Sequence, residues 1–294
     1  MGLAMVRTLS RLRLLYDMHT AGATAFYDYK RPVSNANMLK IALQYAQNFG
    51  GLIQSFPFDA SVAHNGVMNE EENSTRLGLK GIPALSEELQ ISRDLYILEY
   101  TGGRLHIPTI STENSVKLIR AAKKKGLDVS CSVAVHNLCL TDDALETFDT
   151  NYKLLPPLRT PRDVKALLKG LSDGTIDGVT SDHDPIDIER KRTEFDHASY
   201  GSVGLESCFG ALNGCTDIDT AVRALTGLKD AFGVERQSVA EGQTANLTLF
   251  DPTTQWIFTE GSIVSTSKNA ALLGSTMLGN VYGIYNNSQL VLNG

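Results

Sequence analysis

The chain has 294 residues, of which 42% are hydrophobic and 20% are charged, and its formal net charge is −6. These values describe an ordinary globular protein, long enough for one large domain or two smaller ones. A negative balance without a basic stripe argues against nucleic acid as a partner, and no apolar run reaches the roughly 20 residues that span a bilayer, so we expect no membrane contact.

Strand-like and helix-like segments alternate along most of the chain, which favours a parallel sheet with crossover helices. The first clear helix has apolar residues at helical spacing from Met38 to Phe49, with Ser34 as its expected N-cap and Gly50-Gly51 as its end. After it we expect strands over 52–56, 104–110 and 127–135, and helices over 86–100 and over 113–125, the latter capped by Thr112.

The second half of the chain changes character near residue 240. A helix over 163–171 leads into a strand that ends at Asp182, and a further helix is expected over 219–232. Short strands separated by turn residues then follow over 246–252, 256–258 and 289–292. We therefore divide the chain into a β/α body, 1–240, and part of a small β appendage, 241–294. About five β/α steps precede the boundary, whereas a closed barrel of this kind has about eight.

The most informative motif is Thr180-Ser181-Asp182-His183-Asp184-Pro185, because it places a carboxylate and an imidazole at the end of a strand. Ligands bind at that face of a parallel α/β protein. Together with Pro156-Pro157-Leu158-Arg159 and the turn from Gly201 to Glu206, the motif resembles the dihydroorotase branch of the amidohydrolase superfamily, over about residues 15–294.

The resemblance implies a partial (β/α)8 TIM barrel of the metal-dependent amidohydrolase type, whose opening strands we expect to be absent, and an appendage that forms part of a composite β-sandwich. It also implies a chemistry. Members of the family use two zinc ions to hydrolyse cyclic amides, converting dihydroorotate and water to N-carbamoyl-aspartate. Two bridged cations lower the pKa of a bound water and polarise the carbonyl.

The family's metal ligands carry over to this chain only in part. No His-x-His pair occurs in the sequence. The resemblance assigns the bridging carboxylate to Asp28, the final ligand and proton shuttle to Asp182, and, more weakly, an imidazole to His136. It places Phe56 and Thr109 where the family has histidines. Asp28, Asp182 and His136 are therefore vestigial metal candidates, too few for a zinc pair, and we expect no cofactor.

The substrate-binding positions are also substituted, while the sequence around them is kept. Leu155 stands where the family has Asn, and Ile186 where it has His. A lone polar residue at a strand end is most often a satisfied structural group, and we expect His183 to brace its loop by a hydrogen bond. The pattern is typical of a fold retained without its chemistry.

Three functions remain open. The first is a non-catalytic dihydroorotase-like protein of pyrimidine biosynthesis that acts as a scaffold for aspartate carbamoyltransferase or associates with itself. The second is an active dihydroorotase or cyclic amidohydrolase, with two zinc ions held by a missing N-terminal segment and by unconventional ligands such as His64 or His106. The third is a gene remnant without function.

Two further expectations concern the setting and the pocket. The four cysteines include no C-x-x-C pair and residues 1–13 lack the apolar core of a signal peptide, so we expect a reduced, cytoplasmic protein. Strand ends in a parallel barrel converge on one face. We therefore expect a metal-free pocket with Asp182 near its centre, whose floor gathers Asp28, Phe56, Thr109, His136, Leu155 and Ile186.

Overall fold

The computed structural model describes residues 14–293, and its centre is a sheet of five parallel strands in the order β1-β2-β5-β6-β7. The strands are β1 (Ala25–Phe26), β2 (Leu52–Gln54), β5 (Arg104–Ile107), β6 (Val129–Ala134) and β7 (Gly178–Thr180). Each strand pairs in parallel with the next of these strands along the chain. The expected β/α steps, and with them a partial (β/α)8 barrel, are confirmed.

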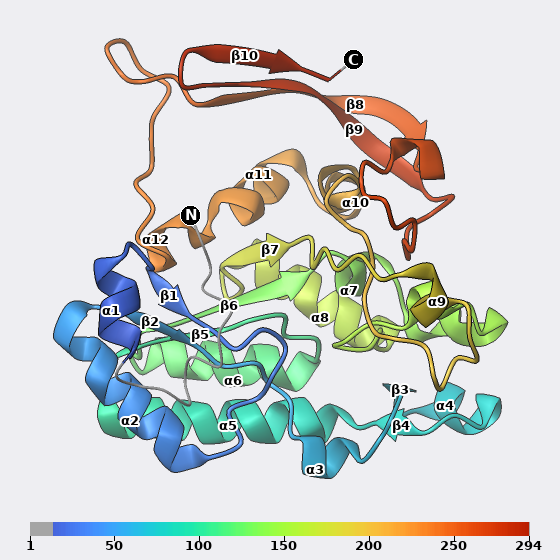
Figure 1. Cartoon of the computed structure of the whole chain (residues 1–294), viewed down its shortest axis with the longest axis horizontal. Coiled ribbons are helices and arrows are strands. Elements are labelled where there is room, and N and C mark those ends of the chain that lie inside the picture. Colours follow the sequence, from blue (N-terminus) through green and yellow to red (C-terminus); the bar gives the residue numbers. More distant parts are fainter. Residues whose placement is uncertain (1–13, 294) are drawn as a thin grey trace.

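The helices that follow the strands pack side by side and bury one face of the sheet. They are α2 (Ala36–Ala46), α5 (Ala84–Thr101), α6 (Glu113–Lys124) and α8 (Pro161–Ser172). Figure 1 shows α2, α5 and α6 beneath the strands. Alternate strand residues point into this layer and join one hydrophobic core, among them Ile53, Leu105, Val133 and Val179.

The helix starts follow from side chains that satisfy free backbone N–H groups. Asn35, and not Ser34 as expected, caps α2, because its side-chain oxygen accepts from the backbone of Asn37 and Met38. Thr112 caps α6 as expected, by accepting from the Ser115 backbone.

The opposite face of the sheet is polar. Residues that alternate with the core positions include Gln54, His106, Ser130 and Ser132, and all four are buried. His106 Nδ1 lies 2.8 Å from Ser130 Oγ, and its Nε2 lies 3.2 Å from Ser132 Oγ. His106 is thus a satisfied structural residue, and burial lowers its pKa to about 3.

Shorter elements complete the body. They are α1 (Leu14–Thr20), η1 (Gln47–Phe49), α3 (Ala60–Ala63), the parallel pair β3 (Met68–Asn69) and β4 (Gly81–Ile82), α4 (Glu72–Leu77), α7 (His136–Cys139), η2 (Asp142–Thr147), η3 (Thr150–Tyr152), α9 (Ile188–Lys191), α10 (Cys208–Cys215), α11 (Ile218–Thr226) and α12 (Leu228–Ala231). The prediction of one continuous helix over 219–232 is wrong, because the structure has two helices there, α11 and α12. The two helices divide at Gly227, where a Cβ would lie 2.1 Å from the Asp177 carbonyl oxygen.

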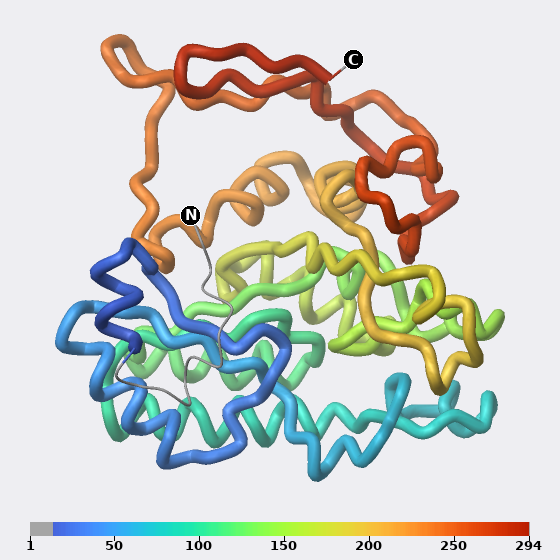
Figure 2. Tube along the Cα trace, viewed as in Figure 1, coloured from blue at the N-terminus to red at the C-terminus, as the bar shows by residue number. Residues whose placement is uncertain are grey.

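A separate antiparallel sheet ends the described chain, in the order β10-β9-β8. Its strands are β8 (Leu247–Ile257), β9 (Thr276–Asn286) and β10 (Gln289–Leu292), with η4 (Glu260–Ser262) between the first two. The two strands expected over 246–252 and 256–258 are one strand with irregular pairing near Asp251, and β9 was not expected. Figure 2 shows the connection over 233–246 rising to this sheet. Strand β9 of the sheet packs on α10.

Two expectations about location depend on particular segments. Within residues 14–293, none of the helices combines the length and the apolar character that a membrane span requires. Residues 1–13, from which we read the absence of a signal peptide, lie outside the described residues. The boundary near residue 240 stays a prediction; the C-terminal sheet itself begins at Leu247.

Candidate functional site

Five of the candidate residues occupy equivalent positions along one edge of the parallel sheet. Asp28, Phe56, Thr109, His136 and Asp182 each lie two residues beyond the last residue of β1, β2, β5, β6 and β7, respectively. Because these strands are parallel, all five positions lie at the carboxyl edge, where ligands bind in this kind of fold.

An ion pair crosses this edge. Lys30 Nζ donates to Asp182 Oδ2 at 2.9 Å and lies 3.6 Å from Asp184 Oδ2. Lys30 follows β1 and Asp182 follows β7, the two outermost strands of the sheet. A flat sheet would separate these strands by about 19 Å. The contact therefore needs a curved sheet, with the segment after β1 folded across it.

The surroundings of this ion pair are aromatic and largely dry. The side chains of Lys30 and Asp182 are 12% and 8% exposed. The Tyr27 hydroxyl accepts from the Lys30 backbone at 3.0 Å, and the Lys30 ammonium lies 5.5 Å from the centre of the Tyr29 ring. Burial raises the pKa of Asp182, and the nearby Lys30 ammonium opposes that rise. Burial also raises the pKa of both tyrosines.

His136 lies at the same edge as a neutral imidazole. Its side chain is buried, and neither ring nitrogen has a hydrogen-bond partner of normal geometry, although the Val203 backbone is close enough to oppose the lowering of its pKa. Burial and, secondarily, the Lys30 charge lower that pKa to about 4. A Cβ at Gly204 would lie 3.1 Å from His136 Cε1 and 2.3 Å from the Ser181 carbonyl oxygen, so only glycine fits beside this ring.

Phe56 and Thr109 supply no imidazole. Phe56 is buried, with its ring 6.1 Å from that of Phe58. Thr109 is buried with its hydroxyl unpartnered, and its φ of 49° is left-handed, as is the 45° of Asp182. A β-branched residue rarely adopts that conformation, and strain of this kind gathers at functional sites.

Asp28, Leu155 and Ile186 are the remaining candidates. Asp28 is half-buried, and its carbonyl accepts from the Arg31 backbone. Leu155 is half-buried in the loop after η3. Ile186 lines a cavity of about 670 Å³ beside α9, whose described lining does not include Asp182. That all of these residues share one pocket floor with Asp182 stays a prediction.

His183 braces its loop as expected, because its Nδ1 accepts from the backbone of Gly204 and Leu205 at 3.3 and 3.2 Å. Since Gly204 also contacts His136, this brace connects the loop after β7 to the ring at the end of β6.

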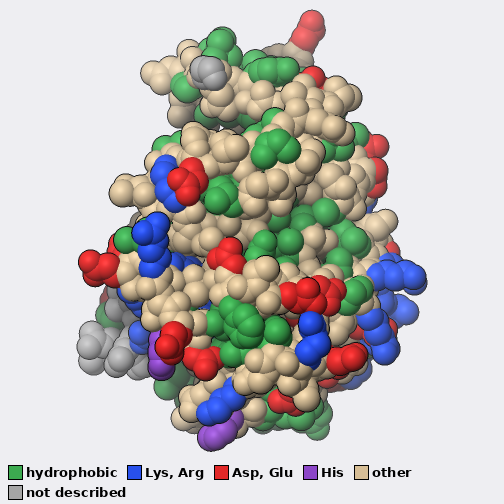
Figure 3. All heavy atoms as spheres, turned by 90° about the vertical axis from the view of Figure 1, so that its right-hand side faces the viewer, with side chains coloured by type: hydrophobic (Ala, Val, Ile, Leu, Met, Phe, Trp, Pro, Cys, Tyr) green, Lys and Arg blue, Asp and Glu red, His purple; other side chains and the backbone are tan. Residues whose placement is uncertain are grey.

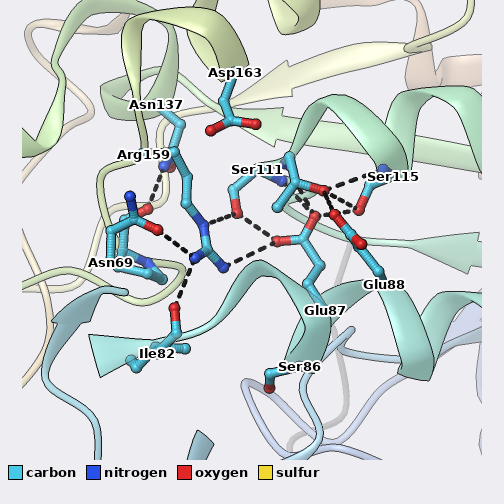
Figure 4. A network of polar contacts seen from close by, with 12 residues as sticks. Asn69, Ile82, Ser86, Glu87, Glu88, Ser111, Ser115, Asn137, Arg159 and Asp163 are labelled. Atoms are coloured by element: carbon cyan, nitrogen blue, oxygen red, sulfur yellow. Dashed lines mark hydrogen bonds and ion pairs between the residues drawn. The ribbon is translucent and has the colours of Figure 1, made fainter. Parts of the chain in front are cut away.

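A second buried network, which the sequence did not reveal, fixes the loop after β5 (Figure 4). Arg159 donates to the Asn69 side chain and to the Ile82 carbonyl, both at 2.8 Å, and to Ser111 Oγ at 3.1 Å. Glu87 lies 3.9 Å from Arg159 and accepts from the backbone and hydroxyl of Ser111. Arg159 was noticed only as part of a motif, and no pattern marks Glu87 within its helix.

The donor set of the candidate site does not fit a pair of zinc ions. Across residues 14–293, no three His, Cys, Asp or Glu side chains are grouped so that they could hold a metal ion. Zinc sites in proteins use several free imidazole, thiolate or carboxylate ligands. Here the carboxylate of Asp182 is already bonded to an ammonium group.

Comparison with known proteins agrees with the fold and the motifs. A family model described as dihydro-orotase-like matches residues 11–115. Dihydroorotases from Trichlorobacter lovleyi and Pelobacter propionicus are 38% and 39% identical to this chain over 277 residues, or 92% of the chain. The alignments cover 65% of each relative, so the chain spans slightly less than two thirds of their length.

Solved structures of similar shape are amidohydrolase barrels. The L-hydantoinase (dihydropyrimidinase) from Arthrobacter aurescens has a TM-score of 0.85 at 21% identity, with 96% of this chain and 67% of that chain covered. A dihydropyrimidinase from Brevibacillus agri has a TM-score of 0.80 at 22% identity, with 100% and 68% covered. At this level of identity the likeness shows the fold.

Proposed function

This chain belongs to the family of dihydro-orotase-like proteins, and from that premise we propose that it is a member that does not hydrolyse dihydroorotate. The observation that carries the proposal is the ion pair between Lys30 and Asp182 at the carboxyl edge of the barrel sheet.

The ion pair opposes metal binding by charge and by occupancy. A divalent cation bound to Asp182 would have to displace the Lys30 ammonium or lie beside it, and two cations repel strongly where water is scarce. Phe56 and Thr109 add no imidazole, and His136 alone is one neutral ligand. We therefore derive no catalytic step through a metal at this site.

The proposal is tested by elemental analysis and by turnover of dihydroorotate, both on protein purified with added zinc. We expect zinc well below one ion per chain and no turnover above that of free zinc in buffer. Two zinc ions per chain together with dihydroorotate hydrolysis would contradict the proposal and favour the alternative of an active cyclic amidohydrolase.

A variant pair tests the physical reason. Lys30→Ala removes the ammonium group, so zinc or manganese should bind more tightly than to the unaltered protein, through Asp182 and His136. Lys165→Ala removes an exposed lysine of α8 and should leave metal binding unchanged. Equal metal affinity in the two variants would show that Lys30 does not exclude the ion.

We further propose that the protein works by association, with aspartate carbamoyltransferase as the first partner to test and self-association as the second. The C-terminal sheet supports a binding role, because Leu290, Val291 and Leu292 are exposed apolar residues on it. In Figure 3 hydrophobic side chains lie exposed at the top of the molecule, over this sheet.

Size-exclusion chromatography with light scattering tests this role, on the purified chain with and without aspartate carbamoyltransferase from the same source. Co-elution at a mass above either component supports the scaffold proposal. A dimer of the chain alone supports self-association. Separate elution of two unchanged species contradicts both.

A further inference from the structure

Two of the four cysteines approach each other at the ends of neighbouring helices. Cys139 is the last residue of α7 and Cys215 the last residue of α10, and their sulfur atoms lie 3.0 Å apart although 76 positions separate them in sequence. Both side chains are half-buried, whereas Cys131 and Cys208 are buried. The pair is thus the place in the described chain where two thiols meet near solvent.

The hydrogen bond between the two sulfurs makes them chemically unequal. The bond from Cys139 lowers the pKa of the Cys215 thiol, and the same contact raises that of Cys139. A thiolate at Cys215 is the nucleophilic form, and both side chains are half-buried, so they can be reached from solvent. Burial raises the pKa of Cys131 and Cys208 to about 12, so these two thiols are inert by comparison.

We propose that Cys139 and Cys215 form a reversible disulfide when the protein meets a low-molecular-weight disulfide such as oxidised glutathione. The Cys215 thiolate attacks one sulfur of the oxidant and releases one thiol, leaving a mixed disulfide. Cys139 then loses its proton and attacks the Cys215 sulfur, releasing the second thiol. Two protein thiols are oxidised, and one small disulfide is reduced to two thiols.

The new bond would join the short helix that contains His136 to helix α10. Helix α7 begins with His136 and ends with Cys139, while α10 follows the turn in which Gly204 abuts the His136 ring. Helix α10 also packs on β9 of the C-terminal sheet. Oxidation therefore fastens the end of β6 to the helix that supports the C-terminal sheet.

The test is titration of the full chain with oxidised and reduced glutathione, followed by counting free thiols in denaturant and by peptide mapping without reductant. We expect the four thiols of the reduced chain to fall to two, with a cross-linked peptide pair containing Cys139 and Cys215, and full recovery on reduction. Closing a loop of this length should also raise the Tm by about 5–10 °C.

Matched variants separate the pair from the other cysteines. Cys208→Ala should still lose two thiols, whereas Cys139→Ser and Cys215→Ser should not form the cross-link. The mapping of the unaltered chain decides the matter even if a variant folds poorly. Retention of all four thiols, a glutathione adduct that stops at Cys215, or a cross-link between other cysteines would each overturn the proposal.

Discussion

Among the ion pairs of residues 14–293, those of Lys30 with Asp182 and of Arg159 with Glu87 have both side chains largely buried, and they differ in how completely their surroundings satisfy them. Arg159 and Glu87 are both 2% exposed, and they form hydrogen bonds with the side chains of Asn69, Ser111 and Ser115 and with backbone groups of Ile82 and Ser111. Lys30 and Asp182 share their edge of the sheet with two tyrosines, an unpartnered imidazole and an unpartnered threonine hydroxyl. Satisfied networks of this kind fix a structure, whereas partly satisfied ones are expected at functional or strained sites.

The largest effect should come from breaking the satisfied network. Arg159→Met removes the charge that faces Glu87 and takes the Arg159 donor away from the Asn69 side-chain oxygen and from the Ile82 carbonyl, which keeps only its bond from the Glu70 backbone. We expect the free energy of unfolding to fall by about 3–5 kcal/mol, measured by urea denaturation. Arg76→Ala, on an exposed arginine, is the control and should change little. If Arg159→Met lowered the free energy of unfolding as little as Arg76→Ala does, the proposed difference between the two ion pairs would be contradicted.

A smaller loss is expected at the partly satisfied pair. Lys30→Met leaves Asp182 buried without its cation, although the carboxyl group can take up a proton because burial already raises its pKa. We expect a loss of about 2 kcal/mol at pH 7 that shrinks as the pH is lowered. The double variant Lys30→Met/Asp182→Asn should recover part of the loss. A loss that does not vary with pH would contradict this explanation.

Close packing beside His136 gives the next effect. Gly204→Ala places a methyl group against the Ser181 carbonyl and the His136 ring, and we expect a cost of about 1–2 kcal/mol in thermal unfolding. Gly214→Ala, in α10, is the matched control, because the nearest atom to its new Cβ is 4.0 Å away. That change should be neutral or slightly stabilising.

The smallest effect concerns pH. Burial lowers the pKa of His106 to about 3 in the folded chain, whereas its pKa is near 6.5 in the unfolded chain. On acidification the unfolded state therefore takes up the proton first. The contribution of His106 to the free energy of unfolding is fully present above about pH 6.5 and is lost as the pH falls toward 3. Between pH 7.5 and 5.5, His106→Gln should therefore lose about 1 kcal/mol less stability than the unaltered chain. His197→Gln, at an exposed histidine, is the control variant.

Local sequence signals predicted the barrel body well and the C-terminal sheet poorly. The apolar periodicity of α2 and the Thr112 cap are properties of neighbouring residues, so they were readable. Strand β9 begins with Thr276 and contains Gly279 and Gly283, which are residues that seldom indicate a strand. Its contacts with α10 and β8, distant in sequence, stabilise it. The close approach of Gly227 to the Asp177 carbonyl joins residues far apart in sequence, and no local pattern records it.

The candidate site shows the same division between local and distant information. The strand-end positions could be located because each follows its own strand. No local signal points to Lys30, because its partner is 152 residues away and the curvature of the sheet brings the two together. The partners of Glu87 were hidden for the same reason.

The equal offset of five residues from their strand ends has a consequence for protein engineering. The backbone sets that offset, so positions 28, 56, 109, 136 and 182 form one row at the carboxyl edge. All five lie outside the strands, so their side chains can be substituted without changing a strand residue. Placing imidazoles at 56 and 109 in a chain without the Lys30 ammonium would install ligands stepwise and measure what each adds.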